Sequence, residues 1–451
     1  MNNSYDVVII GGGISGSALF YVLTNYTNIK KIALVEKYDK PATLSSSANN
    51  NSQTIHAGDI ETNYTKEKAI KVRRSAKLLE NYALFHNLQN KSIFECQKMV
   101  FGVGDKEVEF IKTRHEEFSQ IYPELELFDK DTLRDIEPNI IKTETGSDRS
   151  DNVIGSGIKK SFCAMNFCST ANHMIENSIF NDHKVIFNFN VKNIVEQGDG
   201  GYTLQADGQA PISAKFVLVN AGAHSLLLAQ NMGYGLELGC LPVSGSFYFI
   251  KENKLNGKVY TLQNPKLPFA AVHGDPDIVA KNKTRLGPTA LALPKLERFK
   301  KGTFLDFLKV SGITSGTMNI MFKLLSDSEI RSYIFRNFLY EIPGIGKKYF
   351  LQEAKKIIPS IKLEDLSYAS DFGGIRPQVL DKREKKLILG EKKIKSNKGI
   401  TFNMTPSPGA TSCLKNALVD MLEITDYLGA KIDMEKLNKE LKEDSLEWLV
   451  D

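Results

Sequence analysis

The chain has 451 residues, of which 42% are hydrophobic and 25% are charged, and its formal net charge is +5. This length exceeds one ordinary hydrophobic core, and the composition is that of a globular protein. The mild charge gives no reason to expect nucleic-acid binding, no stretch is long enough to span a bilayer, and the start of the chain lacks the basic region of a secretory signal.

The N-terminal segment contains the most informative pattern. Residues 7–10 are a short apolar run, typical of a strand buried on both faces. Gly11, Gly13 and Gly16 then follow the spacing G-x-G-x-x-G, and a helical pattern comes next. A second apolar run ends at Glu36, which lies 20 residues after Gly16. Strand, glycines, helix, second strand and terminal acid together predict a Rossmann-type dinucleotide-binding unit.

Each residue of this pattern has a physical role. Gly11 permits the tight turn, Gly13 lets a pyrophosphate approach the backbone, and Gly16 lets the helix pack closely on the strand. The phosphates then face the helix N-terminus, and Glu36 accepts a hydrogen bond from a ribose hydroxyl. An acid at this position disfavours the 2′-phosphate of NADP, but the pattern does not distinguish FAD from NAD.

The middle of the chain alternates between polar loops, helices and short strands. The run NNNSQTIHAGD, residues 49–59, has no hydrophobic period and predicts a loop, whereas residues 66–85 predict an amphipathic helix. Short β-runs separated by glycine and aspartate follow at 182–215, and a buried strand at 216–222 ends at Gly222, where a phosphate or another backbone segment can approach.

The predicted secondary structure changes twice in the second half of the chain. Residues 240–291 alternate β-like runs, and residues 296–358 read as helical and basic. Between Lys295 and Lys356 there are 12 basic and 6 acidic residues, a net +6 that exceeds the charge of the whole chain. A returning strand at 372–381 and a strand, Pro/Gly loop and helix at 399–422 complete the pattern.

The segments predict an α/β protein whose Rossmann-type domain is interrupted by a second, α+β substrate domain with a mostly antiparallel sheet. We expect the first domain to comprise residues 1–80, 151–238 and 361–436. The second would comprise 81–150 and 239–360, and residues 437–451 would form a C-terminal helical tail. Five cysteines with no CxxC pair predict neither a disulfide framework nor a zinc site, and they favour a reducing cytosol.

Several long blocks resemble one flavoprotein family. They are VIIGGGISG, SSSANNNSQTIHAGDIETNYT, FVLVNAG, LGCLPVSGSFYF, NPKLPFAAVHGDPD, TRLGPTAL, GIRPQVLD and ITFNMTPSPGATSCLKNALVD. The chain is similar to malate:quinone oxidoreductases of the epsilonproteobacterial type, within the superfamily of FAD-dependent amino-acid and 2-hydroxy-acid oxidases. The resemblance implies non-covalent FAD, oxidation of (S)-malate to oxaloacetate in the tricarboxylic acid cycle, and electron delivery to a membrane quinone. The alternatives are an FAD-dependent L-2-hydroxyglutarate or amino-acid oxidase, and a nucleotide-binding regulatory protein without catalysis.

Malate oxidation requires a base for the hydroxyl proton and groups that hold two carboxylates. His273, at the end of an apolar strand, and His56, in the polar loop, are the candidate bases, because imidazole titrates near neutral pH. The other histidines, His86, His115, His173, His183 and His224, read as surface or structural. Arg376 is the principal candidate for gripping a carboxylate with two parallel hydrogen bonds, and relatives use an arginine in a matching G-x-R-P. We expect Arg285 at the second carboxylate, with Gln53 and Thr54 as hydrogen-bond donors.

The loop at 405–413 is predicted to turn its amides toward the N1–C2=O edge of the flavin. Motif and resemblance together give the predicted cofactor-binding residues: Gly11, Gly13, Ile14, Ser15, Gly16, Glu36, Lys37, Ser52, Gln53, Val191, Gly222, Gly374, Pro408, Gly409, Ala410 and Thr411.

A membrane-resident quinone requires contact with a bilayer. Residues 295–312 and 331–350 mix aromatic with basic side chains, a composition found in helices that lie in a membrane interface. The sequence therefore predicts a cytoplasmic protein bound peripherally to the inner face of the cytoplasmic membrane. The alternative for these segments is ordinary helices that cover a domain.

Overall fold

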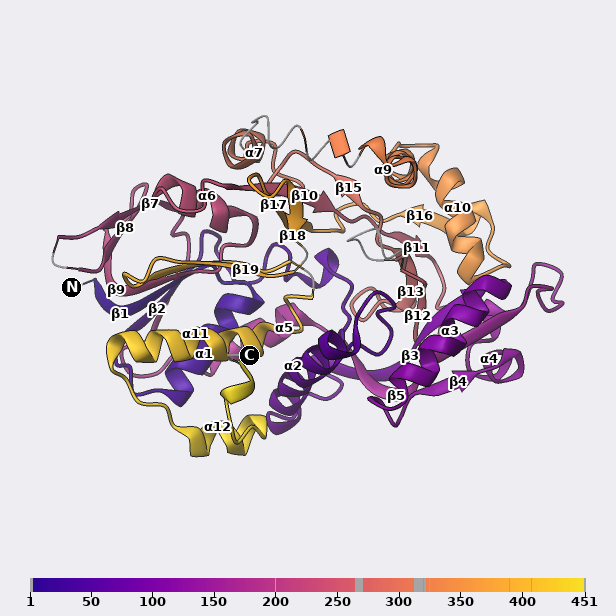
Figure 1. Ribbon diagram of the computed structural model, residues 1–451, viewed down its shortest axis with the longest axis horizontal. Coiled ribbons are helices and arrows are strands. Elements are labelled where there is room, and N and C mark those ends of the chain that lie inside the picture. Colours follow the sequence, from indigo (N-terminus) through magenta and orange to yellow (C-terminus); the bar gives the residue numbers. More distant parts are fainter. Residues whose placement is uncertain are drawn as a thin grey trace.

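The computed structural model describes residues 3–198, 200–263, 271–311, 319, 322–323, 325–388, 390–406 and 408–449 (Figure 1). Its first sheet has the strand order β19-β20-β9-β1-β2-β6, and a β7–β8 hairpin extends from β9. These strands are β1 Ser4–Ile10, β2 Ile32–Val35, β6 Lys184–Ile186, β7 Val191–Glu196, β8 Tyr202–Ala206, β9 Ile212–Val219, β19 Lys392–Lys395 and β20 Ile400–Met404.

The centre of this sheet is parallel, because β1 pairs in parallel with both β2 and β9. Such strands are covered on both faces, which explains why residues 7–10 are continuously apolar and buried. Helix α1, Ile14–Tyr26, covers one face together with α5, Phe167–Glu176, and α11, Cys413–Leu428. The predicted strand–turn–helix unit at the N-terminus is present.

The second sheet has the order β16-β11-β14-β13-β12-β3-β5-β4, and β12–β3 is its single parallel pairing among the described residues. The strands are β3 Ile93–Val103, β4 Glu126–Phe128, β5 Val153–Met165, β11 Tyr248–Ile250, β12 Lys258–Thr261, β13 His273–Pro276, β14 Thr284–Gly287 and β16 Leu366–Tyr368. Its helices are α3 Asp105–Phe118, α4 Lys130–Ile136 and α10 Gly346–Ile357. Residues 264–270, part of a predicted β-run, lie outside the described residues.

A third, antiparallel sheet has the order β15-β10-β17-β18. Its strands are β10 Leu238–Ser244, β15 Leu291–Ala292, β17 Ile375–Asp381 and β18 Lys386–Ile388. The helices α7, Thr303–Ser311, and α9, Ser328–Tyr340, lie with α10 along one edge of the molecule, at the top of the view in Figure 1. Helix α6, Ser225–Asn231, packs against α7.

The predicted fold class is confirmed: a Rossmann-type sheet is interrupted by a mostly antiparallel one. The predicted helix at 66–85 is α2, Lys66–Phe85, and α12, Met434–Leu441, packs against it near the C-terminus. The assignment of segments to two domains stays a prediction. Strands β5 and β16 join the second sheet, although their residues fall within segments predicted for the first domain.

One sequence inference needs correction. The cysteine pattern gave no reason to expect a disulfide, yet Cys96 and Cys163 are bonded, with an S–S distance of 1.98 Å. The two residues are 67 positions apart and lie on the neighbouring antiparallel strands β3 and β5, so no local spacing reveals the pair. Among the described helices, none is long and apolar enough to cross a membrane.

Candidate active site

One cavity of about 1050 Å³ lies where the first sheet, the third sheet and residues 42–56 meet. Residues 42–56 include the first part of the polar loop. The structure brings most of the predicted site residues onto its wall. They are Gly11, Gly13, Ile14, Ser15, Glu36, Lys37, Ser52, Thr54, His56, Val191, Gly222, Gly374, Arg376, Pro408, Gly409, Ala410 and Thr411. Four predicted residues are not on it: Gly16, Gln53, His273 and Arg285.

The β1–α1 turn forms one end of the cavity. Gly11 has φ +108°, and a Cβ there would lie 2.4 Å from the carbonyl oxygen of Asn220. A Cβ on Gly16 would lie 1.9 Å from the carbonyl oxygen of Gly11, so Gly16 permits close packing without reaching the cavity. At Gly13 the sole neighbour within 4 Å of a built Cβ is Ser46 Oγ, so a larger side chain would project into the space that this turn encloses.

Glu36 closes the same end after β2. Its Oε2 accepts a 2.7 Å hydrogen bond from the backbone N–H of Gly12, and its Oε1 accepts one from Tyr38 at 3.0 Å. The carboxylate is thereby fixed against the turn while still lining the cavity. Because each oxygen has two lone pairs, hydroxyl donors can still bind it.

A segment from the other half of the chain crosses this end. Glu297 is buried and forms an ion pair with Lys37, and it accepts a hydrogen bond from Tyr38. His224 Nε2 lies 3.5 Å from Glu297, and burial together with the charge of Lys37 lowers the His224 pKa to about 3. His224 was expected at the surface or in a structural place, but it lines the cavity with Glu297. No sequence signal linked these residues, which come from three separate segments.

His56 lines the cavity in a defined orientation. Its Nδ1 lies 2.6 Å from Glu61 Oε1, and its Nε2 lies 3.4 Å from Ser52 Oγ. The backbone N–H of His56 donates to Thr411 Oγ1 at 3.1 Å, which ties the polar loop to the Pro/Gly loop. Burial alone would raise the pKa of Glu61, but the contact with His56 and the nearby Lys98 lower it to about 2.

His273 lies one layer behind the cavity wall. Its ring stacks on Tyr260 with a centroid distance of 4.1 Å, and the Tyr260 hydroxyl lies 2.7 Å from Thr54 Oγ1. Thr54 lines the cavity, whereas His273 does not. His273 Nδ1 is 3.3 Å from the carbonyl oxygen of Ala271, Nε2 has no hydrogen-bond partner among the described residues, and burial lowers the pKa of His273 to about 3.

The placement of Arg285 corrects the expectation that it meets a substrate carboxylate. Its side chain is fully buried and forms ion pairs with Asp275 and Asp277. It also donates to the backbone oxygens of Asn51 at 3.0 Å and Ser52 at 2.7 Å. With these partners satisfied behind the cavity wall, the guanidinium supports the polar loop from below.

Gln53 likewise faces the protein interior. Its amide donates to Ala48 O and Asp277 Oδ2, and its carbonyl accepts from the backbone N–H of Ile278. It is also one of the non-glycine residues with positive φ, at 51°. The loop at 51–54 therefore lies between the second sheet and the cavity, which is why the side chains of β13 and β14 do not reach the cavity.

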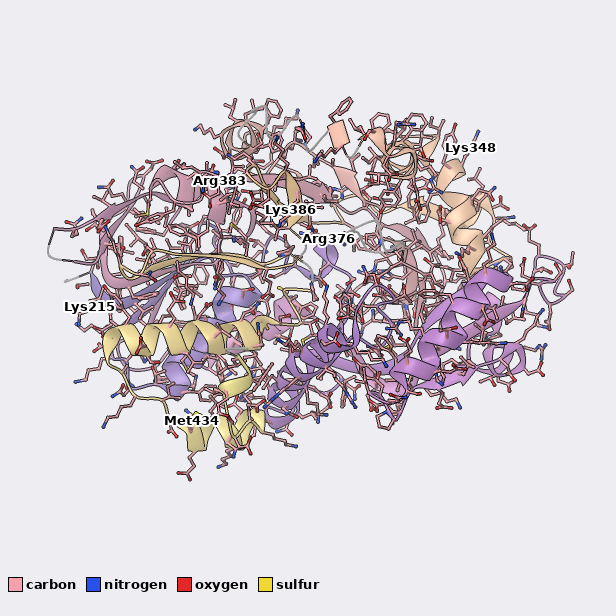
Figure 2. All side chains as sticks on the ribbon, in the orientation of Figure 1. Lys215, Lys348, Arg376, Arg383, Lys386 and Met434 are labelled. Carbon is pink, nitrogen blue, oxygen red and sulfur yellow. A yellow bond between two sulfur atoms is a disulfide. The ribbon has the colours of Figure 1, made fainter. Side chains whose placement is uncertain are left out.

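Arg376 lines the cavity as a partly buried cation, and it has no ion-pair or hydrogen-bond partner among the described residues. Figure 2 labels it near the middle of the molecule. It lies on β17 opposite Val243 of β10, and burial lowers its pKa from the usual arginine value. Arg298, which sequence reasoning placed only within a basic run, also lines the cavity. Its guanidinium is occupied by Ser244, Gly245, Ser246, Tyr368 and Glu341.

Comparisons with known proteins give the family and the fold relatives of the chain. The sequence profile of the family described as "Malate:quinone oxidoreductase (Mqo)" matches residues 3–444. The chain is 55% identical over 452 residues to "Malate:quinone oxidoreductase" of Helicobacter pylori (strain ATCC 700392 / 26695), covering 99% of this chain and 100% of that one. It is 47% identical over 442 residues to the "Probable malate:quinone oxidoreductase" of Campylobacter jejuni, covering 97% and 99%.

Solved structures share the fold. The dithionite-reduced L-α-glycerophosphate oxidase of Mycoplasma pneumoniae with FAD bound superposes with a TM-score of 0.64 at 18% identity, covering 95% of this chain and 96% of that chain. Glycine oxidase of Geobacillus kaustophilus gives a TM-score of 0.62 at 16% identity, covering 93% and 95%.

Proposed function

The chain belongs to the malate:quinone oxidoreductase family, and from that premise we propose that the cavity described above is where malate is oxidised with FAD. The protein is an FAD-dependent oxidoreductase whose substrates are malate and a quinone. The observation that carries the site assignment is that one cavity is lined by two complementary groups: the guanidinium of Arg376, which has no partner among the described residues, and the imidazole of His56, whose Nδ1 faces Glu61.

The residues at the dinucleotide end fit the cofactor. Gly13 leaves open the space that a side chain would fill, and the N-terminus of α1, where the Ile14 N–H donates to Ser46 Oγ at 2.9 Å, lines the end of the cavity at which a pyrophosphate is expected. Glu36 is held in place to accept ribose hydroxyls. When bound, FAD accepts the hydride from C2 of malate and passes two electrons to the quinone. We expect Pro408, Gly409, Ala410 and Thr411 to bound the flavin end.

Arg376 is proposed to bind one carboxylate of malate. A guanidinium without a protein acid beside it, partly withdrawn from water, gains strongly from a bidentate carboxylate. Burial lowers the pKa of Arg376, but the group remains protonated at neutral pH. This contact orients C2 toward the flavin end. It also leaves the second carboxylate to the remaining polar groups of the wall, with Ser52 as a hydroxyl donor. The Thr54 hydroxyl, a predicted donor, is already engaged by the carbonyl oxygen of Ser52 and by Tyr260.

His56 is proposed as the base. It must remove the C2 hydroxyl proton as the hydride leaves, so that the C–O bond becomes a carbonyl. Its Nδ1 faces Glu61, which leaves the Nε2 lone pair as the acceptor on the cavity side. His273 is less suited because it lies behind Thr54 and Tyr260 and its low pKa makes it a weak base.

Anaerobic stopped-flow reduction by malate tests this function. The wild-type flavin should bleach with malate and reoxidise with a quinone analogue, and His56→Asn should slow bleaching by about 10²- to 10⁴-fold while keeping its FAD. Faster bleaching by L-2-hydroxyglutarate or by an amino acid than by malate would instead support the alternative oxidases. A wild-type rate in His56→Asn would remove that residue from the chemistry.

We also propose that the protein attaches peripherally to the cytoplasmic face of the cytoplasmic membrane through the α7–α9–α10 edge. Exposed apolar side chains gather there: Phe299, Phe304, Leu305, Phe322, Leu325, Phe335, Phe338, Ile345 and Tyr349. Exposed cations accompany them: Lys300, Lys301, Lys309, Lys323, Arg331, Arg336 and Lys348. Figure 2 shows Lys348 at this edge. Insertion of the apolar side chains into the membrane interface would favour binding. Each basic residue near anionic lipid headgroups would add roughly 1 kcal/mol of binding free energy.

Vesicle flotation tests the membrane surface. Phe304→Ser, Phe335→Ser and Phe338→Ser together should abolish binding to anionic vesicles and slow electron transfer to a lipid-soluble quinone, with flavin reduction by malate unchanged. Phe85→Ser, Phe110→Ser and Phe180→Ser together, at three exposed phenylalanines away from this edge, form the matched control. Equal binding by both variants would contradict this surface.

A further inference from the structure

The loop that carries His56, residues 55–61, is held by side chains from the second sheet and its helix. Lys98 of β3 donates from Nζ to the carbonyl oxygen of Ile55 at 3.2 Å and forms an ion pair with Asp59 at 2.8 Å. The side chains of Lys98 and Asp59 are 2% and 0% exposed, so this pair is shielded from salt and water. Because Ile55 precedes His56, the hydrogen bond from Lys98 fixes the first end of the loop, and the ion pair ties that end to Asp59.

The other end of the loop is fixed by Arg114 of α3. Its guanidinium donates to the carbonyl oxygens of Asp59 at 2.8 Å, Gly58 at 3.3 Å and Glu61 at 3.0 Å. The hydroxyl of Tyr122 donates to Ala57 O at 2.8 Å. Buried backbone carbonyls require such donors, and together they leave this loop little freedom to rearrange.

Within this frame, Glu61 uses both carboxylate oxygens. Oε1 lies 2.6 Å from His56 Nδ1, and Oε2 accepts from the backbone N–H of Gly58 at 2.9 Å. The side chain is 4% exposed. Lys98 and Arg114 both lie close enough to interact with its charge, so the carboxylate is ionised throughout the neutral range. An ionised carboxylate accepts and cannot donate, which places the imidazole proton on Nδ1.

We propose that Glu61 is a positioning residue that fixes the Nδ1–H tautomer of His56, so that Nε2 faces the cavity as the proton acceptor. This rests on the proposed function of His56. In the reaction the hydroxyl proton of malate moves to Nε2, and the imidazolium then lies between the cavity and a carboxylate of opposite charge. Glu61 therefore both selects the tautomer and stabilises the protonated product of the step.

Other charged or titratable groups face this pair from several elements. Those near Glu61 or His56 are Asp59, Tyr64, Lys68, Lys98, Arg114, Tyr122 and Tyr260. Of these, the cations Lys68, Lys98 and Arg114 favour the ionised form of Glu61. Asp59 is the acid with which they are already paired or in contact, which makes it the appropriate comparison for a test.

Glu61→Gln tests the role through the pH profile of flavin reduction by malate. The variant keeps its volume and FAD but loses the charge that stabilises the imidazolium. We expect the maximal reduction rate to fall by roughly 10- to 100-fold and the acid limb of the profile to move to lower pH. Glu61→Asp should restore part of the rate and return the acid limb toward its wild-type position.

Asp59→Asn is the matched control, because it neutralises a buried carboxylate of the same loop that does not touch His56. It should lower stability but leave the acid limb in place. A Glu61→Gln profile that coincides with wild type, or an equal shift in Asp59→Asn, would overturn the proposal. His56→Asn separates the two hypotheses: full activity there refutes the base itself, whereas loss there with an unmoved Glu61→Gln profile refutes only the role of Glu61.

Discussion

The two walls of the cavity differ in how directly the sequence encodes them. The dinucleotide wall is a single continuous segment in which strand, turn and helix follow one another, and Gly11, Gly13 and Glu36 lie on the cavity as their spacing predicts. The substrate wall is assembled from the loop at 51–54 and from the strands that support it, β13 His273–Pro276 and β14 Thr284–Gly287, which come much later in the chain. A motif whose residues are close in sequence has a geometry that its own segment determines. The residues that line a wall made by distant segments depend instead on which of those segments faces the cavity.

The substrate wall illustrates the effect of an extra layer. Side chains alternate along a strand, so His273 and Asp275 of β13 share one face, and Arg285 of β14 lies opposite Asp275 in register. The sequence predicted that His273 and Arg285 of this face contact the substrate. Instead it carries the loop at 51–54 through the hydrogen bonds of Arg285 to Asn51 and Ser52. The asparagine-rich run is therefore the floor, and the sheet is its support.

The largest expected effect tests the dinucleotide wall. Gly13→Leu should yield folded but colourless protein, because its side chain would occupy the space enclosed by the β1–α1 turn. The ratio of absorbance at 280 nm to that of the flavin band in purified protein measures this loss. Gly198→Leu, at a glycine with nothing within 4 Å of a built Cβ, should keep its FAD. A Gly13→Leu protein that still contains FAD would show that this turn does not bind the cofactor.

A pair of arginines sharpens the contrast between the walls. Arg376→Met should raise KM for malate about 100-fold with little change in the free energy of unfolding, because it removes a charge-assisted carboxylate contact of about 2–3 kcal/mol. Arg285→Met should instead lower the free energy of unfolding by about 3–5 kcal/mol, since it leaves Asp275 and Asp277 with Lys258 as the remaining cation of this cluster.

Steady-state kinetics and urea unfolding measure the two quantities on the same proteins. The contrast would fail if Arg285→Met raised KM as much as Arg376→Met while its stability stayed at the wild-type value. That result would mean that Arg285 reaches the substrate after all.

The same distinction explains how much the sequence could predict. The fold class, the first βα unit and the helix at 66–85 follow from periodicities within single segments. Other contacts form between segments that meet only in the folded chain. They are the Cys96–Cys163 disulfide, the ion pair of Glu297 with Lys37 and the hydrogen bonds of Arg298. His56 was identified as a candidate, but the feature that separates it from His273 is Glu61, whose contact no pattern signals.

A smaller effect is expected at Glu297. This residue joins the two halves of the chain across the dinucleotide end of the cavity. Glu297→Gln should release FAD about 10-fold faster, since the ion pair with Lys37 is lost and a single acceptor oxygen is left to hold the segment over the cavity. Recovery of flavin fluorescence on dilution measures the rate. Glu252→Gln, which breaks an exposed pair with Lys254, is the control. Equal release rates would limit Glu297 to a structural role.

The smallest effect is expected at His273, which tests whether the second sheet acts as support or as a reactive surface. His273→Phe keeps an aromatic ring stacked on Tyr260 and removes both nitrogens, of which Nε2 has no partner among the described residues. Replacing a buried, unpaired polar atom by a ring of similar shape is close to neutral or stabilising. Flavin reduction by malate should therefore stay within about threefold of wild type. A fall of the size expected for His56→Asn would return the proton-accepting role to the sheet, and it would mean that the loop at 51–54 opens during turnover to expose the face beneath it.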